Sequence, residues 1–153
     1  RAFDQYRDRP VHVVHTTFGG AAADGNHCSN GGALSSIGVS WVLTNSVLTH
    51  NRAVGAGANP ARAGTPGGGN GGAIALDGNA FTLAVRGSVL RDNHAKEGGG
   101  GVFFVSNDRT GALAIDRSTL TGNVSEGFET AGYPGIFFLG SGAPVVTDST
   151  LAR

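Results

Sequence analysis

The chain has 153 residues, of which 27 are glycine, and its 11 basic side chains balance its 11 acidic ones. Glycine is present at more than twice its usual share of roughly 7 %. Only 14 % of residues are charged, which excludes a charged disordered tail. The balance of basic and acidic side chains argues against nucleic acid or an anionic membrane as a partner recruited by charge. Cys28 is the only cysteine, which excludes an internal disulfide and a multi-cysteine metal site, and no apolar run approaches the roughly 20 residues of a membrane span.

A short motif, Ser-x-Leu-x-x-Asn, recurs along the chain. Complete copies begin at Ser46, Ser88 and Ser118, and partial copies begin at Thr16 and Ser149. The starting positions are therefore separated by steps of 30, 42, 30 and 31 residues. A repeat of this length, with glycine at its corners, predicts a parallel β-solenoid, in which coils stack because none can bury its own inner face.

Apolar residues hold fixed positions around each motif, as a strand with one buried face requires. Three positions before the motif lie Val13, Leu43, Val85, Ile115 and Val146, and two positions after its start lie Phe18, Leu48, Leu90, Leu120 and Leu151. We expect three short strands per coil and about five coils in one domain, residues 1–153. Because the outer coils are incomplete, we expect a piece of a longer solenoid.

The first and last residues of the motif predict two polar stacks inside the coil. The hydroxyl side chains of Thr16, Ser46, Ser88, Ser118 and Ser149 would form one column, and Asn51, Asn93 and Asn123 would form an asparagine ladder. Asparagine amides can satisfy turn backbone groups from one coil to the next.

Three glycine-led openings, GGALSS, GGAIAL and GGVFF, each precede a motif. Together they resemble the GGA[ILV]…FxxN repeats of right-handed parallel β-helix proteins. That group includes the polymorphic outer-membrane and autotransporter-like surface proteins and, more distantly, pectate-lyase-like enzymes. The resemblance implies a right-handed parallel β-helix in a bacterial protein that is secreted or at the cell surface. It implies no particular activity, because such repeats are mostly structural.

Four insertions follow the third strand and should stack on one edge, where they could form a binding face. They are residues 21–30, 52–70, 94–99 and 124–133, and they carry the ionisable residues Asp24, His27, Cys28, His94, Lys96, Glu97, Glu126, Glu129 and Tyr133. His94, Glu97, Glu126 and Glu129 are the candidates for acid–base chemistry on a glycan. The alternative is a solvated edge without catalysis, in which Tyr133 and Arg62 contribute to binding.

Two phenylalanine doublets leave the facing of the first strand open. If Leu34, Ile74, Phe103 and Phe137 point inward, then Phe104 and Phe138 point outward and offer a stacked platform for a sugar ring or a protein partner. With the opposite parity, Phe104 and Phe138 belong to the core. We take the outward arrangement as the binding hypothesis.

Two other columns have simpler explanations. Arg86 with Asp116, and Arg117 with Asp148, are expected to form cross-strand ion pairs. A lyase-type calcium site is the alternative, but it needs a cluster of carboxylates. A mixed column of Thr17, Val47, Val89, Thr119 and Thr150 suits ordinary strand propensity, with an ice-binding face as the distant alternative.

The sequence therefore predicts a structural or adhesive module that binds a polysaccharide or a surface protein without catalysis and without a cofactor or metal. A polysaccharide-active enzyme, acting through the loop edge, is the competing hypothesis. Open coil ends expose unpaired strand edges, so we also expect end-to-end self-association.

Overall fold

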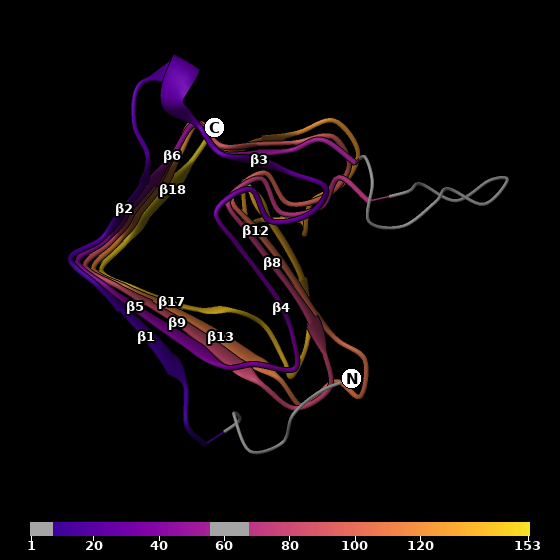
Figure 1. Ribbon diagram of the computed structural model, residues 1–153. Helices are drawn as coiled ribbons and strands as arrows, with labels where there is room; N and C mark the ends of the chain where they lie inside the picture. The colour runs from indigo at the N-terminus through magenta and orange to yellow at the C-terminus, as the bar shows by residue number, and fades with distance from the viewer. Residues whose placement is uncertain (1–7, 56–67) are drawn as a thin grey trace, which may run out of the picture.

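The computed structural model describes residues 8–55 and 68–153, which form an all-β protein of stacked coils. The strands pair only in parallel, in four sheets, and each complete coil contributes one short strand to each sheet (Figure 1). This architecture agrees with the expected parallel β-solenoid of about five coils. A helix long and apolar enough to cross a bilayer is not found in the described residues.

The strands are as follows. Sheet A contains β1 (Val11–Val14), β5 (Trp41–Thr44), β9 (Thr82–Arg86), β13 (Ala112–Asp116) and β17 (Val145–Thr147). Sheet B contains β2 (Thr17–Gly19), β6 (Val47–Thr49), β10 (Val89–Arg91), β14 (Thr119–Thr121) and β18 (Thr150–Ala152). Sheet C contains β3 (His27–Cys28), β7 (Arg52–Ala53), β11 (His94–Ala95) and β15 (Val124–Ser125). Sheet D contains β4 (Leu34–Ile37), β8 (Ile74–Gly78), β12 (Val102–Ser106) and β16 (Ile136–Leu139), and the short 3₁₀ helix η2 (Ala22–Asp24) precedes β3.

Sheet C is a fourth strand position that the prediction of three strands per coil missed. Its strands have two residues each, and they begin where the sequence indicated loops. The backbone amides of Arg52, His94 and Val124 donate to carbonyls of the preceding coil at 2.8–2.9 Å. Two residues are too few to show an alternating pattern, so these strands are defined only by pairing between coils.

The predicted hydroxyl column is confirmed. In each step a backbone amide of one coil donates to the hydroxyl of the next, from Thr16 to Ser46 (3.1 Å), Ser46 to Ser88 (3.0 Å), Ser88 to Ser118 (3.0 Å) and Ser118 to Ser149 (2.9 Å). Each hydroxyl in turn donates to the carbonyl two residues before it, for example from Ser88 Oγ to Arg86 O at 2.9 Å. The column therefore satisfies buried polar groups at the corner between sheets A and B.

The asparagine ladder is also present and is one residue longer than predicted. Asn51 donates from its backbone and its side chain to Asn93 Oδ1 (2.9 and 3.0 Å), and Asn93 does the same to Asn123 Oδ1 (3.2 and 2.8 Å). Asn26 adds a further position, since its side chain donates to Asn51 Oδ1 at 2.8 Å. Asn26 belongs to no complete motif, and therefore the repeat alignment did not reveal it.

The predicted facing of Phe104 and Phe138 is wrong. Phe104 is fully buried, and Phe138 is only 8 % exposed. The alignment matched Gly100-Gly101 to the earlier glycine pairs, whereas the structure pairs Val102 with Ile74 and Phe104 with Leu76. A shift of one residue exchanges the two faces of a strand, so Phe104 and Phe138 join the core and Phe103 and Phe137 face outward.

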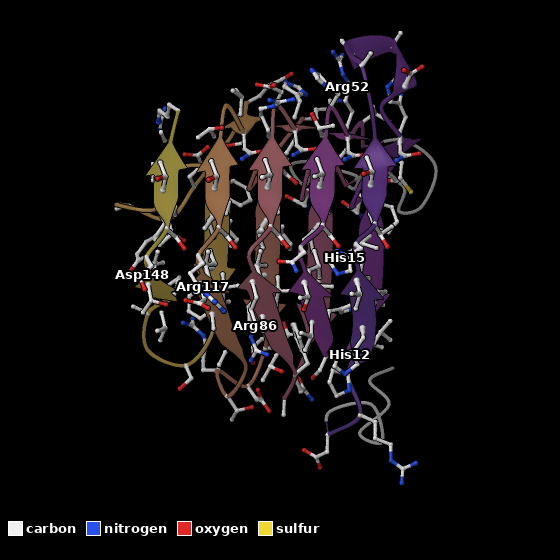
Figure 2. The ribbon with its side chains drawn as sticks, turned by 90° about the vertical axis from the view of Figure 1, so that its left-hand side faces the viewer. His12, His15, Arg52, Arg86, Arg117 and Asp148 are labelled. Carbon is white, nitrogen blue, oxygen red and sulfur yellow. The ribbon has the colours of Figure 1, made fainter. Side chains whose placement is uncertain are left out.

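The corner between sheets A and B is made by one residue per coil in the left-handed conformation. These corner residues are His15 (φ 49°), Asn45 (φ 49°), Gly87 (φ 55°), Arg117 (φ 46°) and Asp148 (φ 47°). Figure 2 shows His15, Arg117 and Asp148 along this corner, with Arg86 and His12 on sheet A. Such a residue bends the chain sharply from sheet A into sheet B without a longer turn.

Candidate functional site

The three carboxylates proposed for catalysis are held by different partners. Glu97 Oε2 accepts a hydrogen bond from Asn70 Nδ2 at 3.0 Å, and Glu126 Oε1 lies 3.2 Å from His94 Nε2. Glu129 accepts hydrogen bonds from Ser125 Oγ and from the Arg153 guanidinium, each at 3.1 Å. Of the four candidates for acid–base chemistry, the structure thus brings together His94 and Glu126.

Of the remaining loop-edge candidates, Tyr133 lines a cleft of about 430 Å³ together with Glu129 and Arg153. Within residues 8–55 and 68–153, no group of three His, Cys, Asp or Glu side chains lies close enough to hold a metal ion. Cys28 is an exposed free thiol, and Asp24 lies in η2. Tyr133 packs against the core, and its hydroxyl donates to the Pro144 carbonyl at 3.5 Å. Arg62 lies outside the described residues.

The expected cross-coil ion pairs of sheet A are also wrong. Asp116 is opposite Arg86, but its ion pair is with Arg117 of its own coil, with Arg117 Nε 2.9 Å from Asp116 Oδ2. Arg117 occupies the left-handed corner, and from there its side chain turns back alongside Asp116 instead of reaching Asp148. Thr147 Oγ1 donates a further hydrogen bond to Asp116 Oδ1 at 3.1 Å.

These contacts predict a pH dependence at Asp116. The hydrogen bond from Arg117, followed by that from Thr147, holds the pKa of the Asp116 carboxyl below its usual value of 3.8. Because the pKa is lowered by folding, the stabilisation is present above about pH 3.8 and is lost as the pH falls through the lower value of the folded state. In the Arg117→Ala variant the pKa should rise toward 3.8, as NMR titration of the carboxyl carbon would show. An unchanged titration midpoint would contradict this role of Arg117, and Arg153→Ala is the matched control.

Sheet B presents the predicted threonine and valine column in full register. Thr17 pairs with Val47, Val47 with Val89, Val89 with Thr119, and Thr119 with Thr150. The neighbouring outward column is irregular, with Gly19, Thr49, Arg91, Thr121 and Ala152 in register. The face therefore lacks a second regular row of hydroxyl groups.

Sheet D carries an exposed aromatic cluster that we call the aromatic patch, formed by Phe103, Phe128 and Phe137. The ring centroids of Phe103 and Phe137 are 5.3 Å apart in a stacked arrangement, and Phe128 meets Phe137 edge-on at 4.7 Å. Phe128 is 39 % exposed. The sequence-based reasoning found the doublets but not Phe128, which comes from the last insertion.

The position of Phe128 depends on a glycine in the preceding coil. Gly98 forms an isolated bridge with Phe128, and a Cβ atom at Gly98 would collide with the phenyl ring. The Phe128 amide donates to the Glu97 carbonyl at 3.1 Å, which fixes the backbone beside the patch. The sequence could have indicated this contact, because a phenylalanine in one coil faces a glycine in the preceding coil. The pair can be recognised only when the register between the insertions is known.

A cleft of about 440 Å³ adjoins the patch on the outer side of sheet D. Its described lining is Asn30, Ser35, Ser36, Ile37, Gly68, Asn70, Ala75, Leu76, Asp77 and Phe103. Phe103 therefore belongs to both features, and together they extend across all four strands of sheet D. An apolar ring surface next to polar groups is typical of sites that bind small polar molecules.

In comparisons with known proteins, no family model matches this chain, and no curated protein or solved structure matches it significantly.

Proposed function

We propose that this protein is a non-catalytic binding module that attaches to a polysaccharide through the outer face of sheet D. The aromatic patch carries the proposal, because outward-facing phenyl rings are otherwise unfavourable on a soluble surface and mark interaction sites. Phe103 and Phe137 occupy one column on adjacent coils. One face of Phe103 stacks on Phe137, and its other face can stack against the apolar face of a sugar ring in the cleft.

The arrangement also suits an extended ligand. Adjacent strands lie about 4.8 Å apart, so β4, β8, β12 and β16 present a row of binding positions along the stack. The cleft spans the first two strands of this row, and the patch spans the last two. An extended chain of sugars can therefore contact both features, whereas a single ring would use only one.

Three further properties belong to the same proposal. The repeats resemble those of bacterial surface proteins, which supports a secreted or cell-surface location. The parallel connections between strands of one sheet favour a right-handed coil, as such crossovers usually are. An adhesive or structural role suits a scaffold of stacked coils in which Glu97, Glu126 and Glu129 each have a local partner.

The test is a glycan-array screen followed by titration calorimetry with the best ligand. The double variant Phe103→Ala/Phe137→Ala should lose about 10- to 100-fold in affinity, because each aromatic contact contributes about 0.5–1.5 kcal/mol. The matched control is Val14→Ala/Val145→Ala, which removes exposed apolar side chains from sheet A and should bind as the unmodified chain does. Binding to no glycan, or equal binding by the double variant, would refute the proposal.

A further inference from the structure

The cleft beside the aromatic patch is created by a change in side-chain size along one column. Ser35, Ala75, Phe103 and Phe137 are in register on successive strands of sheet D. Two coils carry small side chains and the next two carry phenyl rings, so the surface steps down from Phe103 onto a floor of Ser35 and Ala75. The ring of Phe103 thus forms one wall of the cleft.

Two polar side chains of the lining, Asn30 and Asn70, already have partners. Asn30 Oδ1 accepts the backbone amides of Gly69 (2.9 Å) and Asn70 (3.0 Å). Asn70 donates to Glu97 and accepts the Gly98 amide at 3.1 Å. These bonds hold both amide groups in place and occupy hydrogen-bonding groups that a ligand could otherwise use.

Asp77 is the one ionisable side chain among the described residues of the lining. Its Oδ1 accepts the Gly78 amide at 2.7 Å and Asn107 Nδ2 at 3.0 Å, which fix the carboxyl group. Within residues 8–55 and 68–153, Asp77 forms no ion pair and its Oδ2 accepts no hydrogen bond. This exposed, oriented oxygen is therefore free to bind a donor.

Phe103 and Asp77 are diagonal neighbours on adjacent strands, since Phe103 is opposite Ala75 and Asp77 is opposite Val105. A strand spacing of about 4.8 Å and a rise of about 3.3 Å per residue place their Cα atoms roughly 8 Å apart. A ring that stacks on Phe103 can thus direct a substituent toward Asp77. The carboxylate and the negative face of the phenyl ring both attract a cation, and the carboxylate repels an anion.

We propose that the cleft binds a sugar residue that carries a protonated amino group, with the ammonium donating to Asp77 Oδ2. This inference rests on the proposed function, because the same glycan would continue from the cleft onto the aromatic patch. It assigns to Asp77 the selection of amino sugars over acetylated and acidic ones.

The experiment compares glucosamine oligosaccharides with their N-acetylated counterparts of equal length, at a pH that keeps the amine protonated, by titration calorimetry. The unmodified chain should prefer the amine form by about tenfold, as a charge-assisted hydrogen bond predicts. Asp77→Asn should abolish this preference and retain binding of the acetylated form. Asp148→Asn is the control, because it removes the same charge at the exposed corner of sheets A and B and should keep the preference.

The outcomes separate the two proposals. Equal affinity for both oligosaccharides, or a preference that survives Asp77→Asn, would overturn the role of Asp77. If binding at the same time still depended on Phe103 and Phe137, the proposed function would stand. The absence of binding to any glycan would overturn both.

Discussion

Replacement of Phe104 by alanine should lower the free energy of unfolding by about 3–5 kcal/mol. Phe104 is fully buried, and its ring centroid lies 4.5 Å from that of Phe81 and 5.2 Å from that of Phe138. The variant loses these contacts and leaves a cavity between coils whose backbones are paired and cannot close it. Urea denaturation should show a lower midpoint with an unchanged slope.

Phe103→Ala is the matched control, since it removes the same side chain from the adjacent position of β12. Phe103 is only partly buried, and its loss should cost about 1 kcal/mol. Equal losses in the two variants would contradict the register described for sheet D. The pair also has opposite functional effects, because Phe104→Ala leaves the aromatic patch intact and Phe103→Ala removes part of it.

Replacement of Asn93 by alanine should lower the free energy of unfolding by about 3 kcal/mol or more. Asn93 Oδ1 accepts both the backbone amide and the side chain of Asn51, and Asn93 Nδ2 donates to the Leu48 carbonyl at 2.9 Å. The variant leaves these buried groups without partners, and each unsatisfied group costs about 1–3 kcal/mol.

The loss at Asn93 should be measured by urea denaturation and by hydrogen exchange of the Asn51 amide. Exchange of that amide should accelerate beyond the change that lower global stability produces. Asn79→Ala is the control, because Asn79 is exposed, and it should change stability by no more than about 0.5 kcal/mol. If the two variants are equally stable, the ladder contributes nothing measurable.

Much of the scaffold was predictable because each position of the motif faces the same way, inward or outward, in every coil. Ser88, Leu90 and Asn93 define their columns in the sequence and keep them in the structure. Each column supplies the same group in every coil. The Ser88 column supplies a hydroxyl, the Leu90 column an apolar side chain, and the Asn93 column a side-chain amide at the turn. Repetition therefore makes burial visible in the sequence.

The binding face was less predictable because it depends on register at a single place. Four consecutive glycines, Gly98 to Gly101, offer more than one alignment with the glycine pairs of the other coils, and the choice decides whether Phe103 or Phe104 is outside. Gly99 has a positive φ of 62°, as do Gly31 (62°) and Gly71 (68°), and this conformation identifies the true correspondence. Four identical residues in a row do not reveal which of them adopts the positive φ.

The ionic contacts were mispredicted for a related reason. Opposite positions on adjacent strands were correctly assigned for Arg86 and Asp116, but long side chains choose among several partners within reach. The corner conformation of Arg117 brings its guanidinium to Asp116 instead of Asp148. The repeat positions predict which residues lie opposite each other on adjacent strands. They do not predict which partner a long, flexible side chain contacts.

The strands of successive coils pair with one another along the axis of the stack. A tensile force applied along this axis therefore loads the coil interfaces in series, so every interface carries the same force and the weakest one should separate first. A coil of 30 residues, the spacing between Ser88 and Ser118, releases roughly 100 Å of chain when it unravels. Under such a force the protein should unfold coil by coil, extend in discrete increments and dissipate work at each step, instead of unfolding in one event.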